Sequence, residues 1–145
     1  MNPRHILLVE DNPSDQALTL RALRKGGILN EVIVVHDGAE ALDYLFFAGE
    51  HANRSPENPA LVLLDLNLPK IGGLEVLRRM RADERTGSTL VVILTSSGEE
   101  RDLKEAYEAG ANSYVRKPVE FNAFATAVQT LGLYWVLINE PPPSN

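Results

Sequence analysis

Five short runs of apolar residues divide the 145-residue chain, and stretches with helical periodicity separate them. The runs at 61–64 and 90–94 are apolar at every position, with no alternating polar residue. Strands of this kind are covered by helices on both faces, as in a parallel sheet. The alternation of strands and helices therefore predicts an α/β fold. We expect the strands at 5–9, 32–35, 61–64, 90–94 and 114–115.

Signals for helix starts and ends lie between these runs. Asn12-Pro13 offers an N-cap followed by proline at the first helical position. Asp37-Gly38 is also a strong hairpin signal, but the periodic apolar residues after it favour a helix. Apolar residues at helical spacing also mark a third helix at 74–80 and a fourth at 103–107, and Gly110 ends the fourth. With a last helix after residue 120, the expected order is (βα)5.

Right-handed crossovers between parallel strands then predict a doubly wound, flavodoxin-like fold with one five-stranded sheet. The natural strand order is 2-1-3-4-5, with helices on both faces of the sheet. In such folds, binding sites lie at the carboxyl ends of the strands. Functional residues are therefore expected directly after the strands.

Two segments are longer than this plan requires. The polar stretch at about 48–59 contains two prolines and is expected to be a surface loop. The last helix carries an apolar stripe from Phe121 to Trp135, and further apolar residues at 133–138 surround it. This surplus predicts either a homodimer through the last helix or packing within its own domain. We expect one domain over 1–139 and a flexible, proline-rich tail at 140–145.

The composition narrows the classes of function. A net charge of -6 disfavours binding to nucleic acid and to anionic membranes. No apolar run approaches the ~18 residues that span a bilayer. The absence of cysteine excludes disulfides, thiol catalysis and thiolate metal sites, and it suits a reducing compartment. We therefore expect a cytoplasmic protein that binds neither DNA nor membrane directly.

Three carboxylates are expected to meet at one edge of the sheet. Glu10 and Asp11 follow the first strand, and Asp65 follows the third. Their mutual repulsion requires a counterion. A hard cation such as Mg²⁺ takes one or two carboxylates and completes its coordination with waters or phosphate oxygens. The sequence therefore predicts a Mg²⁺ site used in phosphate chemistry.

The same edge receives a nucleophile and two phosphate-binding groups. Asp65 can attack phosphorus to form an acyl phosphate while a metal offsets the charge of the transferred oxygens. Thr95 ends the fourth strand and Lys117 follows the fifth, so a hydroxyl and an ammonium converge there and could bind phosphate oxygens. Each feature alone is weak, because strand-end threonines and acidic pairs in loops are usually structural. Their joint placement predicts a phosphoacceptor site.

Four motifs resemble the receiver domain of two-component response regulators, over residues 6 to about 131. They are ILLVEDN at 6–12, LLDLNLP at 63–69, LTSS at 94–97 and GANSYVRKP at 110–118. The resemblance implies that Asp65 accepts a phosphoryl group from a sensor histidine kinase and that the Lys117–Pro118 bond is cis. The other roles that it implies are metal binding by Glu10, Asp11, Asp65 and the Asn67 carbonyl, phosphoryl binding by Thr95 and Lys117, and switching by Thr95 and Tyr114.

The resemblance also implies how the switch works. A phosphoryl group on Asp65 would draw Thr95 toward it, and Tyr114 would turn into the vacated space. Partner binding or dimerisation would then change. The chain is accordingly expected to be a switch that catalyses only its own phosphorylation and dephosphorylation, rather than an enzyme.

Several details are similar to the single-domain regulators that partner phytochrome-type histidine kinases. They are the segment 10–13, the longer loop before the third strand, and the segments 131–135 and 139–142. The implied partner is a bacteriophytochrome. One departure from the family is Gly72-Gly73, because an aspartate usually precedes this glycine, and its loss weakens the cap of the third helix.

Three other functions fit the sequence less well. A Mg²⁺-dependent phosphohydrolase needs a second acid two residues after its nucleophile, where Asn67 stands. A flavodoxin-like nucleotide binder needs a glycine-rich phosphate loop after the first strand, where Glu10 and Asp11 repel phosphate. A receiver-like module that acts without phosphorylation is expected to have lost its acceptor, hydroxyl or ammonium group. The histidines His5, His36 and His51 lack metal-ligand spacing and are expected to be structural or exposed.

Overall fold

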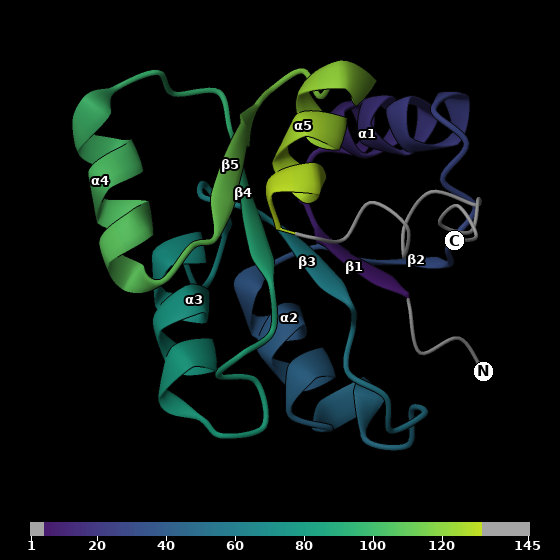
Figure 1. Ribbon diagram of the computed structural model, residues 1–145. Helices are drawn as coiled ribbons and strands as arrows, with labels where there is room; N and C mark the ends of the chain where they lie inside the picture. The colour runs from purple at the N-terminus through teal and green to yellow at the C-terminus, as the bar shows by residue number, and fades with distance from the viewer. Residues whose placement is uncertain (1–4, 132–145) are drawn as a thin grey trace, which may run out of the picture.

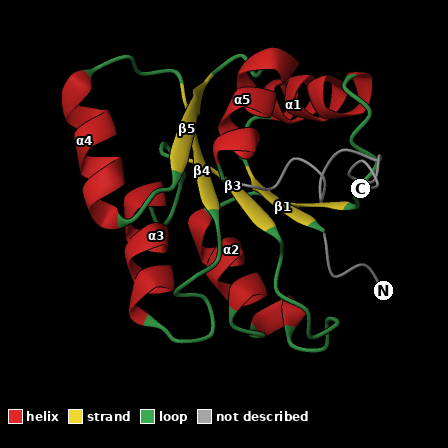
Figure 2. Cartoon of the chain, viewed as in Figure 1, coloured by secondary structure: helices red, strands yellow, loops and turns green. Residues whose placement is uncertain are grey.

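The computed structural model describes residues 5–131 of the chain. Five parallel strands form one sheet in the order β2-β1-β3-β4-β5, which confirms the predicted strand order. Figures 1 and 2 show the strands side by side, with helices on both sides of the sheet. The strands are β1 (Ile6–Val9), β2 (Val32–Val35), β3 (Leu61–Asp65), β4 (Val91–Thr95) and β5 (Ser113–Arg116).

Within residues 5–131, α-helices follow each of the five strands, and a short 3-10 helix, η1, lies in the second connection. Their alternation with the strands confirms the (βα)5 plan. None of the helices in this part of the chain is long and apolar enough to cross a bilayer. The helices are α1 (Pro13–Lys25), α2 (Gly38–Leu45), η1 (Gly49–His51), α3 (Gly73–Ala82), α4 (Glu100–Ala109) and α5 (Phe121–Thr130).

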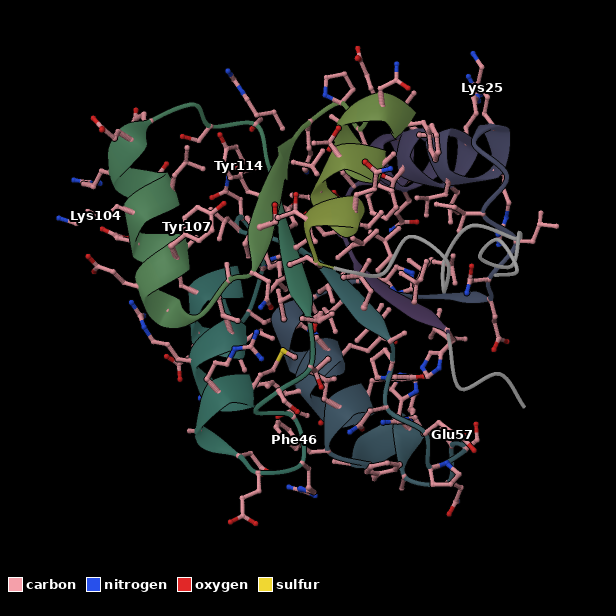
Figure 3. The ribbon with its side chains drawn as sticks, viewed as in Figure 1. Lys25, Phe46, Glu57, Lys104, Tyr107 and Tyr114 are labelled. Atoms are coloured by element: carbon pink, nitrogen blue, oxygen red, sulfur yellow. The ribbon has the colours of Figure 1, made fainter. Side chains whose placement is uncertain are left out.

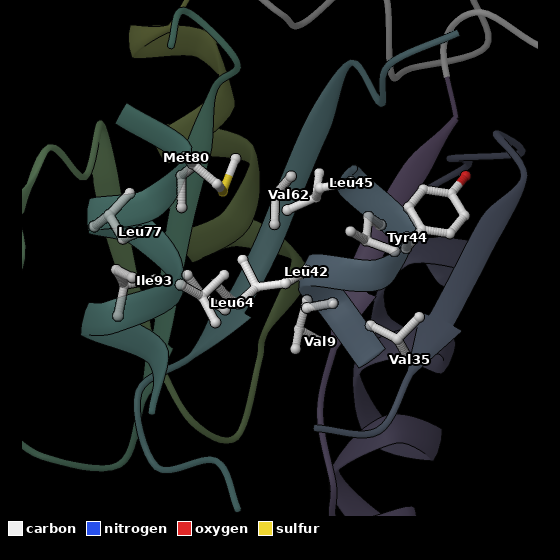
Figure 4. Close-up of a cluster of buried hydrophobic side chains, with 14 of the residues drawn as sticks. Val9, Val35, Leu42, Tyr44, Leu45, Val62, Leu64, Leu77, Met80 and Ile93 are labelled. Carbon is white, nitrogen blue, oxygen red and sulfur yellow. The ribbon is translucent and has the colours of Figure 1, made fainter. Parts of the chain in front are cut away.

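The helices divide between the two faces of the sheet (Figure 1). On the face of α1 and α5, Leu8 and Phe124 belong to one buried cluster. On the face of α2, α3 and α4, Val62 and Met80 belong to a second cluster (Figure 4). Successive residues of β3 enter the two clusters alternately. Because both faces are covered, a central strand has no polar face, which explains the uninterrupted apolar runs.

Three helix ends lie where the sequence predicts them. Oδ1 of Asn12 accepts a hydrogen bond from the N–H of Asp15 at 3.0 Å and caps α1. Oδ1 of Asp37 accepts one from the N–H of Glu40 at 2.7 Å, so this segment begins α2 rather than a hairpin. Gly110 ends α4 in the left-handed region, with φ 112°.

The connection between α2 and β3 is held against α2. Nε of Arg54 donates to the carbonyl oxygen of Tyr44 at 2.6 Å. The guanidinium of Arg54 also lies 4.0 Å from the ring centroids of both Tyr44 and Phe47. The stretch expected as a surface loop therefore contains η1 and an anchoring arginine, and neither was visible in the sequence pattern.

The last helix is described as far as Thr130, and Leu131 follows it. Phe124 and Val128 of the expected apolar stripe are buried, whereas Phe121 and Leu131 are half-buried. The remainder of the stripe at Trp135, the surplus apolar residues at 133–138 and the tail at 140–145 lie outside the described residues.

Candidate functional site

The strand register brings the predicted site residues to one edge of the sheet. In β1 and β3, paired residues directly precede Glu10 and Asp65, so the two carboxylates lie at the same level on neighbouring strands. Thr95 is paired with the residue before Lys117, which places those two side chains at the same edge. Four residues that are distant in the sequence therefore converge because parallel strands end together.

Asp65 lies at the centre of this group and is 3% exposed. Its Oδ1 accepts a hydrogen bond from the N–H of Asn67 at 3.1 Å. Its Oδ2 accepts one from Nζ of Lys117 at 3.0 Å. The side chain is thus held in one orientation by the following turn and by Lys117, the residue after β5. A carboxylate oriented in this way, beside a cation, is suited to act as a nucleophile.

Glu10 has no exposed surface. Its Oε2 accepts a hydrogen bond from the N–H of Asn12 at 3.2 Å. Its Oε1 lies 2.8 Å from the ammonium of Lys117, which supplies the opposite charge. Burial raises the pKa of Glu10 to about 7, against the hydrogen bonds with Lys117 and Asn12, which lower it. Glu10 is therefore a buried acid whose charged form is favoured by Lys117 and by the N–H of Asn12.

The acidic residues of the site fit a divalent cation. One carboxylate oxygen from each of Glu10, Asp11 and Asp65 lies within 4.8 Å of the others. Asp11 is exposed whereas the other two are buried, so the group opens to solvent on one side. Hard cations bind such clustered carboxylate oxygens and keep waters on their open side. The single ammonium of Lys117 lies among the carboxylates of Glu10, Asp15 and Asp65, so the acids of the site carry excess negative charge that such a cation would offset.

The ammonium of Lys117 contacts three carboxylates. It lies 2.8 Å from Oε1 of Glu10 and 3.0 Å from Oδ2 of both Asp65 and Asp15. Burial acts to lower the pKa of Lys117, but its hydrogen bonds with the three acids outweigh burial and raise the pKa above the ordinary value. The next peptide bond, Lys117–Pro118, is cis as predicted. Asp15, in the first turn of α1, was not predicted as a site residue.

Thr95 connects the site to α4. It is 1% exposed, and its Oγ1 accepts a hydrogen bond from the N–H of Ser97 at 3.0 Å. Oγ of Ser97 donates to Oδ2 of Asp102 at 2.7 Å and accepts from the N–H of Glu99 at 3.1 Å. Sequence reasoning identified Thr95 but missed Ser97 and Asp102. Any displacement of Thr95 therefore acts on the turn that begins α4.

Tyr114 lies on the same face of the sheet as Thr95. It pairs with Ile93, two residues before Thr95, and side chains two residues apart in a strand point to the same face. The ring of Tyr114 meets the ring of Tyr107 on α4 edge to face, with centroids 6.1 Å apart (Figure 3). Because Tyr107 is 46% exposed, a rotation of Tyr114 would change the surface of α4.

Gly73 allows α3 to begin directly against the acceptor strand. A β-carbon at this position would lie 2.3 Å from the carbonyl oxygen of Asp65 and 2.8 Å from the α-carbon of Leu66. At Gly72, in contrast, the position of a β-carbon has no neighbour within 4 Å, and α3 receives no side-chain cap there. The departure from the family's aspartate thus removes a cap, as predicted. The need for glycine at the second position was not predicted.

The three histidines lie around α2, and each has a structural contact. Nε2 of His5 lies 2.7 Å from the hydroxyl of Tyr44 inside the protein. His36 and His51 both contact the carboxylate of Glu40, at 2.9 and 3.1 Å. Burial acts to raise the pKa of Glu40, but its hydrogen bonds with His51 and His36 outweigh burial and hold the pKa below its usual value. Sequence reasoning did not identify Glu40 as an acid that the two histidines share.

Comparisons with known proteins agree with this geometry. Residues 6–129 match the family described as the response regulator receiver domain. Response regulator Rcp1 of Synechocystis sp. strain PCC 6803 is 38% identical over 134 residues, which make up 92% of this chain and 90% of Rcp1. The Mn²⁺-bound form of Rcp1 gives a TM-score of 0.75 at 37% identity, covering 98% of this chain and 100% of that one.

Two bacteriophytochrome response regulators also have similar structures. RtBRR gives a TM-score of 0.86 at 53% identity, covering 99% of this chain and 86% of RtBRR. AtBRR gives the same score at 55% identity, covering 94% of this chain and 98% of AtBRR. The family match spans most of the chain, and the acids, the threonine and the lysine occupy the strand ends where the receiver motifs place them. The chain therefore belongs to the response regulator receiver family.

Proposed function

We propose that Asp65 accepts a phosphoryl group from a sensor histidine kinase and thereby switches the chain between two states with different partner affinities. One observation carries this proposal. The Asp65 carboxylate lies close to the carboxylates of Glu10 and Asp11. The ammonium of Lys117 lies 3.0 Å from Oδ2 of Asp65. A nucleophile, cation ligands and a phosphate-binding cation are thus present in one place.

The proposed reaction transfers phosphorus from nitrogen to oxygen. An oxygen of Asp65 forms a bond to phosphorus as the bond between phosphorus and the imidazole nitrogen of a phosphohistidine donor breaks, and that nitrogen keeps the electron pair. Lys117 then binds a phosphoryl oxygen, and the hydroxyl of Thr95 donates a hydrogen bond to another. Both side chains reach the edge of the sheet where the phosphoryl group would stand.

We propose Mg²⁺ as the cation, bound by Glu10, Asp11, Asp65 and the carbonyl oxygen of Asn67. When bound, it would offset the charge of the phosphoryl oxygens during transfer. The clustered carboxylate oxygens of Glu10, Asp11 and Asp65 support this assignment. The existence of a Mn²⁺-bound form of the relative Rcp1 is consistent with a divalent cation in the family.

The proposed output is a change of surface at α4 and β5. A phosphoryl group on Asp65 draws Thr95 toward it, which removes the hydrogen bond from the N–H of Ser97 to Thr95. Tyr114 then turns inward and leaves Tyr107. Replacing Tyr114 by alanine should leave phosphorylation intact but reduce the difference in partner affinity between the two states. Equal differences in the variant and the native chain would contradict this mechanism.

We also propose that the chain is a switch rather than a turnover enzyme. Asn67 follows Asp65 by two residues, where a phosphohydrolase of the rival class needs an acid to protonate its leaving group. A module that acts without phosphorylation is disfavoured because Asp65, Thr95 and Lys117 are all retained at the site. No observation favours either rival.

The similarity to RtBRR and AtBRR supports a place in bacteriophytochrome signalling, with a bacteriophytochrome as the kinase. Three further features remain proposals from the sequence. They are a receiver domain over 1–139 with a tail at 140–145, a homodimer through the last helix, and a cytoplasmic location. The expectation of protein partners rather than DNA is also a proposal, which rests on the net charge of -6. Sedimentation that shows only monomer at high concentration would remove the dimer.

Intact-mass spectrometry tests the proposed function. The native chain, Asp65→Asn and the control Asp43→Asn, which changes an acid on α2 outside the site, are incubated with MgCl2 and acetyl phosphate. We expect a single phosphoryl adduct on the native chain and on the control, none on Asp65→Asn, and none when Mg²⁺ is chelated. An equal adduct on Asp65→Asn would place the acceptor elsewhere. If neither acetyl phosphate nor a histidine kinase produces an adduct, the result would favour a receiver-like module that acts without phosphorylation.

A further inference from the structure

Asp15 is the fourth acid at the site, and it reaches the site from a helix rather than from a strand end. Its Oδ2 accepts a hydrogen bond from Nζ of Lys117 at 3.0 Å. The side chain of Asp15 is 31% exposed, whereas that of Lys117 is 13% exposed. The contact therefore joins the rim of the site to its enclosed ammonium.

The backbone and the carboxylate of Asp15 have separate tasks. Its N–H donates to Oδ1 of Asn12 and closes the first turn of α1. Its carboxylate makes the contact with Lys117. Replacing the carboxylate by an amide therefore leaves the helix cap in place, and the contact with Lys117 can be tested alone.

Asp15 differs from the other two acids that contact Lys117. Glu10 and Asp65 belong to the group that fits a cation, and Asp65 is the proposed acceptor. Asp15 belongs to neither set. A cation and a phosphoryl group bound here would engage the oxygens of Glu10 and Asp65, and Asp15 would remain as an acid with a full charge beside Lys117.

We infer that Asp15 is a positioning residue that holds the ammonium of Lys117 toward α1 and competes with the phosphoryl group for it. This inference rests on the proposed function of Asp65. Oδ2 of Asp15 and Oδ2 of Asp65 both lie 3.0 Å from Nζ of Lys117, so the two oxygens are within about 6 Å of each other. At such a distance in a partly buried site, two charges still interact strongly.

The charge of Asp15 should have opposite effects on the binding of a phosphoryl group and on the binding of a cation. The charge of Asp15 repels an anionic phosphoryl group on its neighbour and draws Lys117 away from it, so removing this charge should strengthen phosphoryl binding. The same charge attracts a cation and draws Lys117 away from Glu10 and Asp65, the cation ligands. Its removal should therefore weaken the binding of a cation when no phosphoryl group is present.

The experiment compares the native chain with Asp15→Asn, Asp15→Glu and Glu108→Gln. Asp15→Glu keeps the negative charge beside Lys117. Glu108→Gln makes the same change of net charge on the exposed surface of α4. Calorimetry measures the Kd of Mg²⁺ alone, and then the Kd of beryllofluoride, an analogue of the phosphoryl group, at saturating Mg²⁺. Urea unfolding checks that each variant is folded.

For Asp15→Asn we expect the Kd of Mg²⁺ to rise and the Kd of beryllofluoride to fall, each on the order of fivefold. The values for Asp15→Glu and Glu108→Gln should stay within about twofold of native. If Asp15 had only a structural role, Asp15→Asn would bind both Mg²⁺ and beryllofluoride more weakly than the native chain. Unchanged or weaker beryllofluoride binding in Asp15→Asn therefore overturns the inference. If the native chain binds neither Mg²⁺ nor the analogue, the proposed function fails together with it.

Discussion

The ammonium of Lys117 lies 3.0 Å from a carboxylate oxygen of Asp65, although 52 positions separate the two residues in the chain. The contact crosses β4, which lies between their strands in the sheet. It is one of three contacts that Lys117 makes with acids. The edge of the sheet therefore carries more negative than positive charge, and Lys117 is central to its stability.

Replacing Lys117 by methionine should destabilise the chain by about 3 kcal/mol, because buried acids lose their counter-charge. Added MgCl2 should restore a large part of this loss, since a cation bound by the same acids supplies the missing charge. Urea unfolding of the native chain and Lys117→Met, with and without MgCl2, measures both effects. An equal loss in both conditions would contradict cation binding by these acids.

Replacing Gly73 by alanine should destabilise the chain by at least about 2 kcal/mol, because the new β-carbon would meet the backbone of Asp65 at 2.3 Å. Gly72→Ala is the matched control, since its β-carbon has no neighbour within 4 Å. Thermal unfolding of both variants gives the comparison. Equal stabilities would show that α3 does not need this close approach to the acceptor strand.

Replacing Ser97 by alanine should loosen the first turn of α4, because the side chain hydrogen-bonds both the N–H of Glu99 and the carboxylate of Asp102. We expect a loss of about 1 kcal/mol, comparable to the loss of a helix cap. Hydrogen exchange of the α4 amides should accelerate, while that of the α1 amides should not. The neighbouring Ser96 is exposed, and Ser96→Ala should leave both rates unchanged.

Replacing Glu40 by glutamine should have an effect that depends on pH. The pKa of Glu40 is lowered in the folded chain, so its carboxylate stabilises the fold above the ordinary value of 4.5. That contribution is lost as pH falls through the lower folded-state pKa. We expect Glu40→Gln to be less stable than native by about 1 kcal/mol at pH 7, and this difference to shrink below pH 4.5.

Urea unfolding of the native chain and Glu40→Gln across pH 3 to 8 measures this difference. Glu75→Gln removes an acid from an exposed ion pair with Arg79, which contributes little to stability at any pH. Its difference from native should stay small throughout. A Glu40→Gln difference that grows as pH falls from 4.5 to 3 would contradict the role of the two histidines as partners of this acid.

The sequence predicted where the strands lie and which residues stand at their ends because both follow from periodicity along the chain, and the strand order followed from right-handed crossovers. Glu10, Asp65 and Thr95 each come directly after an apolar run, so parallel strands must bring them together. Asp15 was missed for a related reason. Its place depends on the rotation of α1 against the sheet, and a helical pattern with exposed polar positions does not define which acid faces the site.

Other features depend on contacts between segments whose distance the sequence does not give. The requirement for glycine at position 73 comes from the carbonyl oxygen of Asp65, which only the packing of α3 brings near. The sharing of Glu40 by His36 and His51 arises because the connection after α2 returns along that helix. Neither relationship leaves a periodic signal in the chain.

The pairing of α1 with α5 on one face has a consequence for synthesis. Leu8 of β1 and Phe124 of α5 belong to the same buried cluster, although β1 emerges from the ribosome long before α5. Until α5 follows, an apolar part of the sheet lacks its second cover and can bind chaperones or other nascent chains. Chains that stop after Glu120 should therefore aggregate during expression, even though they carry every residue of the phosphoacceptor site.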